Sequence, residues 1–278
     1  MRPTAQTVVA GVVGDPVRHS LSPLIHNAAF AALGIDGTYV AFPVSAHSGN
    51  AIVSALRCLG IVGLSVTMPH KEVVAATADE VSSDVALLGA ANTLVNRNGV
   101  IRAEVTDGQG CVAALRASGF DPEGRRCLVL GAGGAGRAVA LSLARAGARE
   151  LVIVNRGDSR AERTLALVGR VARRGSLDDV REVDLIVNAT PIGMGTDELL
   201  PLDPVHLSRG QFVNDLVYHP LETPLLKAAR VAGAQCVDGL GMLVYQAGLQ
   251  FEIWTGQPAP IRAMRDAVTS ELQRRAKP

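Results

Sequence analysis

The chain has 278 residues, of which 48% are hydrophobic and 19% are charged. These values describe a well-packed globular protein with enough length for two domains or one large one. The formal net charge of +1, with arginines spread along the whole sequence, argues against a nucleic-acid binder.

Apolar runs typical of strands alternate with helical patterns along most of the chain, which predicts an α/β fold with mostly parallel sheets. In the first part, we expect strands at 7–14, 39–44 and 61–67, and helices at 22–34 and 50–59. Ser22 is expected to cap the first helix, with Pro23 in its first turn. Residues 92–96 and 100–104 flank Asn98-Gly99, which predicts a hairpin.

A second unit with a repeating β-α-β pattern begins near Gly108. Its expected strands are 126–130, 151–155, 185–189 and 212–217, and its expected helices are 112–116, 137–146 and 160–168. Two further helical patterns, at 241–254 and 261–275, follow with no strand between them.

Lys71 is one of only three lysines among 27 basic residues, and it ends the stretch Gly63-Leu-Ser-Val-Thr-Met-Pro-His-Lys71. Arginine does not release its proton, whereas a lysine shielded from water can be tuned to do so. The lysine follows the predicted strand 61–67, and active-site groups tend to collect where such strands end. The alternative is a solvated lysine that opens a helix.

Gly131-x-Gly133-x-x-Gly136 follows the predicted strand 126–130 and opens a helix. Glycines in this context let the backbone approach a pyrophosphate at a helix N-terminus. The pattern therefore predicts a dinucleotide site, and the alternative is a tight turn between a strand and a helix.

The end of the next predicted strand bears on which dinucleotide is bound. An acidic residue there would hold the ribose 2′-hydroxyl of NAD, but the chain has Val154-Asn155-Arg156, followed by Arg160. Two arginines offer forked donors to a 2′-phosphate, which predicts NADP. Asp158 could instead meet a 2′-hydroxyl, so NAD stays open, and both arginines could also be solvated residues at a helix start.

Polar residues of the first unit also gather at predicted strand ends. Ser20 and Ser22 bracket a helix N-terminus, which is an anion pocket of hydroxyls and backbone N–H groups. Asn92 starts one strand, and Asp107 follows another within Thr106-Asp107-Gly108. Asp107 could instead cap the helix that follows it.

A series of motifs carries a resemblance to a known family. The motifs are Gly14-Asp-Pro-x-x-His-Ser20-x-Ser22-Pro, Val66-Thr67-x-Pro-x-Lys71, Ala91-Asn92-Thr-Leu, Thr106-Asp107-Gly108, Gly131-Ala-Gly-Gly-Ala, Asn155-Arg156, Asn188-Ala-Thr-Pro-x-Gly193-Met and Asp238-Gly239-Leu-Gly-Met-Leu-Val-x-Gln246. In order and spacing they resemble the shikimate dehydrogenase family over essentially the whole chain.

This resemblance implies reversible, NADP-linked reduction of 3-dehydroshikimate to shikimate, a step of chorismate and aromatic amino acid biosynthesis. It implies a substrate domain of residues 1–108, completed by C-terminal helices within 242–278, and a Rossmann domain of residues 109–241. The acting form would be a monomer or homodimer.

The resemblance also implies roles for individual residues. Lys71 and Asp107 would form the catalytic pair, in which an ammonium stabilises the charge that grows on the substrate oxygen and then supplies the proton. Which of the two is the formal base in the oxidation direction stays open. Ser20 and Ser22, with Tyr218 nearby, would hold the substrate carboxylate, whereas the ring hydroxyls would bond to Thr67, Asn92 and Gln246. The residues that would contact NADP are Gly131, Ala132, Gly133, Gly134, Ala135, Asn155, Arg156, Arg160, Leu216 and Gly239.

The chain departs from the family pattern at a few positions. Val105 stands where the family commonly has asparagine, and Ser65 where it often has asparagine, which bears on hydrogen bonds that support the substrate pocket. Gly157-Asp158 stands where NADP-using members usually show threonine, which bears on the preference for NADP.

Three alternatives stay open beside an NADP-linked shikimate dehydrogenase. They are a quinate/shikimate dehydrogenase that uses NAD, an aminoshikimate-type relative, and an inactive ligand-sensing regulator of the same fold. Ser22 favours shikimate, because quinate-using relatives often carry threonine there, and the presence of both Lys71 and Asp107 argues against the regulator.

The four cysteines lie far apart and form no C-x-x-C pair, so we expect neither a metal site nor a disulfide framework. The apolar stretch at 8–13 is too short for a signal core, and no uninterrupted apolar run approaches the ~18 residues of a membrane span. We therefore expect a cytoplasmic protein that acts on a small molecule and binds neither nucleic acid nor a membrane.

Overall fold

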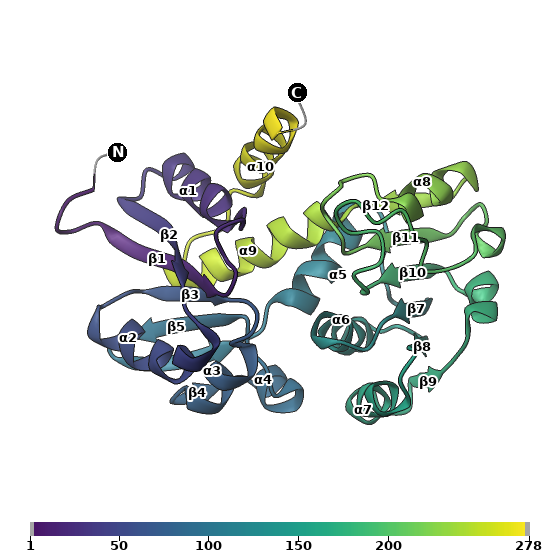
Figure 1. Cartoon of the computed structure of the whole chain (residues 1–278), viewed down its shortest axis with the longest axis horizontal. Helices are drawn as coiled ribbons and strands as arrows, with labels where there is room; N and C mark the ends of the chain where they lie inside the picture. Colours follow the sequence, from purple (N-terminus) through teal and green to yellow (C-terminus); the bar gives the residue numbers. More distant parts are fainter. Residues whose placement is uncertain (1–2, 276–278) are drawn as a thin grey trace. The chain divides into compact units, whose positions relative to one another are not determined.

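A computed structural model describes residues 3–275 (Figure 1). The ends of the expected substrate domain, at residues 1–2 and 276–278, lie outside the described residues. The chain forms two compact units, one that runs to Thr106 and resumes at Gln246, and one that spans Asp107–Tyr245. Each unit is built on a six-stranded sheet, which confirms the predicted α/β class.

The sheet of the first unit has the strand order β2-β1-β3-β5-β6-β4. Its strands are β1 (Val8–Gly14), β2 (Gly37–Pro43), β3 (Gly63–Val66), β4 (Glu80–Val81), β5 (Thr93–Arg97) and β6 (Val100–Glu104). β5 runs antiparallel to both β3 and β6, and the β5–β6 hairpin confirms the prediction from Asn98-Gly99. Asn98 (φ 55°) and Gly99 (φ 90°) adopt the left-handed conformation that this tight turn requires.

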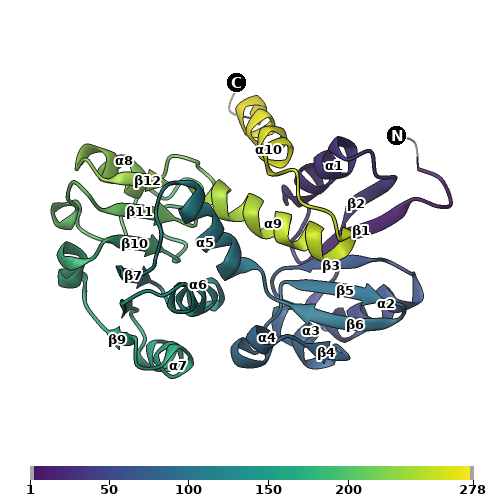
Figure 2. The same ribbon diagram turned by 180° about the vertical axis from the view of Figure 1, so that it is seen from behind.

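Helices cover both faces of this first sheet. The helices are α1 (Ser22–Ala32), the short 3-10 helix η1 (Ala46–Ala51), α2 (Ile52–Cys58), α3 (Lys71–Thr77), α4 (Ser83–Leu88), the later part of α9 (Gly239–Thr255) and α10 (Ile261–Arg275). α1 and α10 pack together on one face, whereas α2, α3 and α4 lie on the other (Figures 1 and 2). The core beneath α2 and α3 joins Leu56 and Val74 to strand residues such as Leu94 and Ile101.

The sheet of the second unit has the strand order β12-β11-β10-β7-β8-β9, with neighbouring strands parallel. Its strands are β7 (Arg126–Leu130), β8 (Glu150–Val154), β9 (Ala172–Arg174), β10 (Leu185–Asn188), β11 (Phe212–Asp215) and β12 (Gln235–Val237). The chain first winds from β7 towards β9 and then returns to β10 and winds the other way. This is the doubly wound order, in which ligands bind outside the carboxyl ends of the strands, where the winding reverses.

Two hydrophobic cores sandwich this second sheet. The helices are α5 (Asp107–Ala117), α6 (Gly134–Arg145), α7 (Asp158–Val168), the 3-10 helices η2 (Leu177–Glu182) and η3 (Pro204–His206), and α8 (Pro224–Val231). Along β7, Cys127 and Val129 face the core under α5 and α6, whereas Leu128 and Leu130 face the core under α8. Burial on both faces explains why these strands read as unbroken apolar runs in the sequence. Among residues 3–275, no helix is long and apolar enough to cross a membrane.

His26 is a fully buried ionisable group in the first unit, on α1. Its ring stacks on Tyr39 at a centroid distance of 4.3 Å and lies 5.0 Å from the Trp254 ring. Neither ring nitrogen has a hydrogen-bond partner among the described residues. Burial lowers the pKa of His26 to about 3, because the imidazolium cannot be hydrated there.

This buried imidazole should make the protein less stable in mild acid. Since the folded-state pKa of about 3 lies below the unfolded value of 6.5, the unfolded chain takes up a proton that the folded chain refuses. Above pH 6.5 the protonation of His26 leaves the free energy of unfolding unchanged. At pH 5 it lowers that free energy by about 2 kcal/mol. Urea denaturation at pH 7.5 and at pH 5 should show that the free energy of unfolding falls more for wild type than for His26→Phe.

The control for this experiment is His47→Phe, since His47 is an exposed histidine of the same unit. It should show the same loss between pH 7.5 and pH 5 as wild type. An unchanged loss in His26→Phe as well would mean that the buried imidazole is not the group that titrates.

Candidate active site

Ser20 and Ser22 lie at the start of α1. Ser20 Oγ accepts a hydrogen bond from the backbone N–H of Ser22 at 3.2 Å. The residue at the N-cap position is Leu21, which is already helical (φ −86°, ψ −9°), so the prediction that Ser22 caps this helix was wrong. Ser22 is the first helical residue, and its hydroxyl is therefore not committed to capping. Two hydroxyls beside the N–H groups of a first turn suit a carboxylate.

Lys71 is the first residue of α3, just beyond the end of β3, and its side chain is half-buried. Its carbonyl accepts a hydrogen bond from the Ala91 amide at 2.9 Å, which ties the start of α3 to the segment before β5. Thr67, between β3 and α3, donates its amide to the Val13 carbonyl at 3.0 Å. The lysine thus opens a helix and also lies where a strand ends, so the two interpretations of its position are compatible.

Asn92 is buried in the first unit, and its side-chain amide is held on several sides. Asn92 Oδ1 accepts from the Thr106 amide at 2.8 Å and from the Thr93 hydroxyl at 2.8 Å. Asn92 Nδ2 donates to Thr106 Oγ1 at 3.0 Å and to Gln246 Oε1 at 3.3 Å. Two residues that the motifs select, Asn92 and Gln246, are therefore in direct contact.

The later part of α9 places three polar side chains at four-residue intervals against β5 and the residue before it. Gln246 accepts from Asn92, and one turn later Gln250 Nε2 donates to the Asn92 carbonyl at 3.1 Å. After a further turn, Trp254 Nε1 donates to the Leu94 carbonyl at 3.0 Å. β3 makes room for this indole at Gly63, where a Cβ would lie 2.0 Å from Trp254 Nε1.

Ser65 extends these bonds to a buried tyrosine. The Tyr39 hydroxyl donates to Ser65 Oγ at 2.6 Å, and Ser65 Oγ donates to Gln250 Oε1 at 2.6 Å. Burial raises the pKa of Tyr39, so its hydroxyl stays protonated as a donor. Ser65, which departs from the family pattern, thus supports Gln250. Sequence reasoning missed Tyr39 and Gln250, although Gln250 lies one helical turn from Gln246.

Asp107 is the first residue of α5 and is half-buried. The glycine that follows it is required by packing, since a Cβ on Gly108 would lie 2.1 Å from the Ala138 carbonyl oxygen of α6. Val105, where the family commonly has asparagine, packs against the core of the first unit. An apolar contact therefore takes the place of an amide at that position.

The glycine-rich turn lies between β7 and α6. Gly131 has φ +96°, a backbone conformation that favours glycine, and a Cβ on Gly136 would lie 2.0 Å from the Gly131 carbonyl oxygen, so packing requires glycine at 136. A Cβ on Gly133 or Gly134 would meet no heavy atom within 4 Å among the described residues. The middle of the turn is thus open at the N-terminus of a 12-residue helix, and this arrangement fits a dinucleotide pyrophosphate.

Asn155 connects this turn to the segment after β8. Its Oδ1 accepts from the Ala132 amide at 3.1 Å, and its Nδ2 donates to the Gly157 carbonyl at 2.7 Å. Arg156 and Arg160 flank the start of α7 with exposed side chains. Asn155 therefore fixes the position of one loop relative to the other, and both arginines are open to a ligand.

Replacing Asn155 with alanine should weaken the binding of both NADP+ and NAD+, because the turn that contains Ala132 loses its hydrogen bond to the Asn155 side chain. Two neutral hydrogen bonds correspond to about 1–2 kcal/mol, or roughly a five- to thirtyfold rise in both Kd values. Isothermal titration calorimetry with each cofactor would measure this. Asn96→Ala is the control, since Asn96 orders the β5–β6 hairpin through the Gly99 amide at 2.9 Å and should not affect cofactor binding. If Asn155→Ala lost affinity for NADP+ alone, Asn155 would not act by holding the turn.

A buried carboxyl group orders the segment that contains Leu216 and Tyr218. Asp215 accepts from Asn188 Nδ2 at 2.9 Å, from the Val217 amide at 3.1 Å and from Thr223 Oγ1 at 2.7 Å. Burial raises the pKa of Asp215 and also that of Tyr218. Sequence reasoning gave no role to Asp215, which became recognisable once the topology placed β10 beside β11.

Gly239 begins α9 against the same segment. A Cβ there would lie 2.5 Å from the Val217 carbonyl oxygen and 2.6 Å from that of Leu216. Asp238 Oδ1 accepts from the Gly241 amide at 3.0 Å, in the manner of a helix cap. Glycine is therefore needed so that the helix can start close to the Leu216 backbone. Within the described part of the chain, no group of three or more His, Cys, Asp or Glu side chains could hold a metal ion.

Comparison with known proteins gives matches along most of the chain. Residues 12–94 match the family model of the shikimate dehydrogenase substrate binding domain. Residues 114–192 match that of shikimate/quinate 5-dehydrogenase, and residues 239–269 that of the shikimate 5′-dehydrogenase C-terminal domain.

Individual relatives are similar over nearly the full length. The NADP+ shikimate dehydrogenase of Methanopyrus kandleri is 47% identical, with 97% of each chain covered. A crystal structure of a shikimate dehydrogenase in complex with NADP+ superposes with a TM-score of 0.92 at 37% identity and 98% coverage of each chain. The Thermus thermophilus enzyme in complex with NADP(H) and shikimate gives 0.90 at 35% identity, covering 95% of this chain and 99% of that one.

Proposed function

This chain belongs to the shikimate dehydrogenase family, and on that premise we propose which of its residues carry the reaction. The protein is an oxidoreductase that catalyses the reversible, NADP-linked reduction of 3-dehydroshikimate to shikimate in chorismate and aromatic amino acid biosynthesis. The observation that carries this function is the agreement with an NADP+ shikimate dehydrogenase over 97% of both chains.

Different parts of the chain bind the substrate and the cofactor. In our proposal, residues 1–108 and the helices within 242–278 bind the substrate, and residues 109–241 bind NADP. The contact between Asn92 and Gln246 supports the first assignment, because it links the N-terminal sheet to α9. The open turn at Gly133 and Gly134 supports the second.

NADP, when bound, would supply or accept the hydride. Lys71 Nζ donates a proton to the substrate oxygen as its charge grows during reduction, and it takes the proton back during oxidation, a contribution of roughly 10²–10⁴-fold. Asp107 is the carboxylate assigned to this lysine by its motif. Its role in the proposal is to orient the ammonium group and a substrate hydroxyl.

The remaining residues position the substrate and the cofactor. Ser20, Ser22 and the Tyr218 hydroxyl, which burial keeps protonated, bond the substrate carboxylate. Thr67, Asn92 and Gln246 bond the ring hydroxyls. The cofactor contacts are Gly131, Ala132, Gly133, Gly134, Ala135, Asn155, Arg156, Arg160, Leu216 and Gly239.

Initial rates with shikimate and quinate, each with NADP+ and with NAD+, test the function directly. We expect kcat/KM for shikimate with NADP+ to exceed each other combination by at least about tenfold, or about 1.4 kcal/mol. A higher value for quinate with NAD+ would favour the quinate/shikimate alternative. The absence of turnover in all four combinations would favour the regulator. The relatives favour neither alternative.

The compartment and the assembly belong to the same proposal. All four cysteines are free thiols, two of them buried, which suits a reducing cytoplasm. We assign the protein to the cytoplasm as a monomer or homodimer, and light scattering coupled to gel filtration would distinguish the two states.

A further inference from the structure

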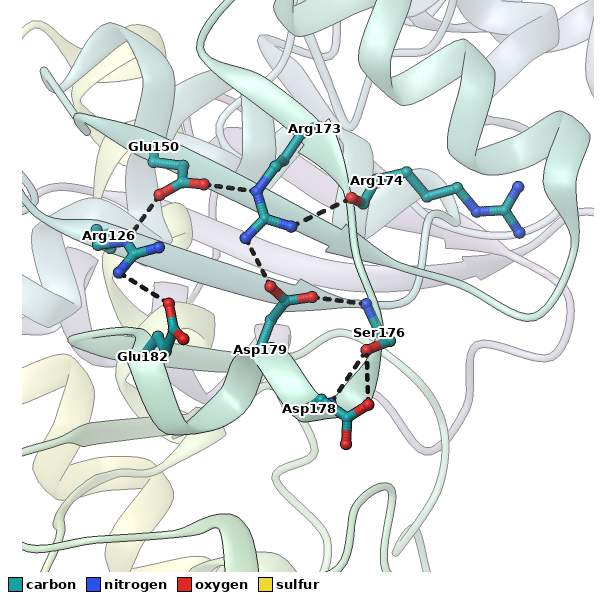
Figure 3. Close-up of polar contacts among 8 residues, drawn as sticks. All are labelled: Arg126, Glu150, Arg173, Arg174, Ser176, Asp178, Asp179 and Glu182. Carbon is teal, nitrogen blue, oxygen red and sulfur yellow. Dashed lines mark hydrogen bonds and ion pairs between the residues drawn. The ribbon is translucent and has the colours of Figure 1, made fainter.

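Two neighbouring arginines end β9, and their side chains have different partners. Arg173 bonds to Glu150 and to Asp179, each at 2.6 Å, and Arg126 also bonds to Glu150, at 2.7 Å (Figure 3). Arg174 contributes its carbonyl oxygen to this network, as an acceptor for Arg173 Nη1 at 3.3 Å. The Arg174 guanidinium, however, points away from the network (Figure 3). The Arg173 side chain is thus held in a structural role that Arg174 does not share.

The partner of Arg174 is Asp158, the first residue of α7, with which it forms an ion pair. β9 pairs in parallel with β8, with Arg174 opposite Ile153, so the carboxyl ends of both strands bring the arginine beside the start of α7. An aspartate in a first helical turn is favoured by the helix dipole. The two side chains are 49% and 70% exposed, so their pair adds little to folding stability.

Asp158 stands between the two arginines assigned to the 2′-phosphate, two residues from each. A carboxylate there repels a 2′-phosphate and can accept a hydrogen bond from a 2′-hydroxyl, so by itself it would favour NAD. Arg156, Arg160 and Arg174 carry three positive charges against the one negative charge of Asp158, a net of +2. Without Arg174 the net charge beside the phosphate position falls to +1.

We propose that Arg174 is a specificity-determining residue that acts through Asp158. By pairing with this carboxylate, it offsets the charge that would repel the 2′-phosphate and occupies an oxygen that would otherwise be offered to the 2′-hydroxyl. Arg174 is therefore a positioning residue for NADP selection. This inference rests on the proposed function, since it presupposes that NADP is the cofactor.

A double-mutant cycle separates an action through Asp158 from a direct contact with the phosphate. The proteins are wild type, Arg174→Ala, Asp158→Ala and the double variant, and the readout is the Kd of NADP+ and of NAD+ by calorimetry. Arg174→Ala should raise the Kd of NADP+ by about tenfold, the scale of one uncompensated charge several ångströms from a phosphate. Its Kd for NAD+ should stay within about twofold of wild type or fall.

The other variants make the proposal specific. Asp158→Ala should leave NADP+ binding unchanged or tighter, and the double variant should return to within about threefold of wild type, because no carboxylate is left to offset. Arg116→Ala is the matched control. It breaks another exposed pair, Arg116–Asp121 at 3.3 Å with side chains 53% and 58% exposed, and should change neither Kd.

Three results would overturn the inference. A double variant that binds NADP+ as weakly as Arg174→Ala would mean that the arginine contacts the phosphate itself. An equal change for both cofactors in Arg174→Ala, or no change for either, would mean that it has no part in selection. A wild type that does not prefer NADP+ would instead refute the proposed function, and the first titrations of the series establish that separately.

Discussion

Replacing Lys71 with alanine should lower kcat for shikimate oxidation by at least about a hundredfold while leaving the Kd of NADP+ nearly unchanged. The reason is that, in our proposal, its ammonium acts on the substrate oxygen, whereas the glycine-rich turn that we propose binds NADP belongs to the other unit. Steady-state rates and calorimetry on the same preparation would measure both quantities.

Two further lysine variants define what the ammonium does. Lys71→Arg should also be poor, because arginine keeps the charge but does not exchange the proton. Lys227→Ala removes an exposed lysine of α8 and should retain full activity. The assignment of Lys71 as proton donor fails if Lys71→Ala keeps more than about a tenth of the wild-type kcat.

Changing both Arg156 and Arg160 to alanine should weaken the binding of NADP+ by a few kcal/mol, which raises its Kd by about a hundredfold or more. Each guanidinium offers hydrogen bonds to a charged phosphate at about 1.5–3 kcal/mol per bond. NAD+ lacks that phosphate, so its Kd should scarcely change. Titrations of both cofactors into wild type and the double variant test this expectation.

A charge-matched control for that experiment is the double change Arg116→Ala and Arg230→Ala. Both arginines form exposed ion pairs in the same unit, with Asp121 and Glu222. Removing them changes the net charge by the same amount and should leave both cofactors bound as in wild type. Equal losses of NAD+ and NADP+ in the Arg156/Arg160 variant would rule out a phosphate clamp.

The sequence predicted the elements whose local chemistry agrees with the fold. The β5–β6 hairpin follows from Asn98-Gly99, and β7 with α6 follows from an apolar run and a glycine-rich turn. β9 went unrecognised because Ala172-Arg-Arg has no strand propensity of its own and becomes a strand by pairing with β8. β12 is equally short, and its pairing with β11 likewise depends on tertiary context.

The helix α5 was predicted too short, from residue 112 instead of Asp107. Gly108 and Gly110 are weak helix formers, which hides this part of the helix from a propensity argument. Glycine is required at position 108 because α6 lies too close to α5 there for any side chain. The packing requirement that selects the glycine thus removes the local signal for the helix.

For the site, motifs selected residues that are expected to touch a ligand, and the structure added the residues that hold them. Asn92 and Gln246 lie within motifs, whereas Tyr39 and Gln250 resemble any core tyrosine and helical glutamine in sequence. Arg174 has no pattern around it, and its ion pair depends on the pairing of β8 with β9. Supporting contacts of this kind arise from tertiary structure, which local sequence does not encode.

The polar side chains along α9 also determine the axial register of that helix on the first sheet. A helix with a purely apolar face could slide by one turn, about 5.4 Å, with one aliphatic side chain replacing the next. Trp254 can only donate a hydrogen bond, whereas Gln250 donates and accepts, so neither can take the place of the other against β5. The position of Gln246 along the helix axis is therefore set two turns away, by an indole to which our proposal assigns no part in binding. Substitutions at Trp254 should consequently reduce the selectivity for the ring hydroxyls of the substrate in variants that still fold.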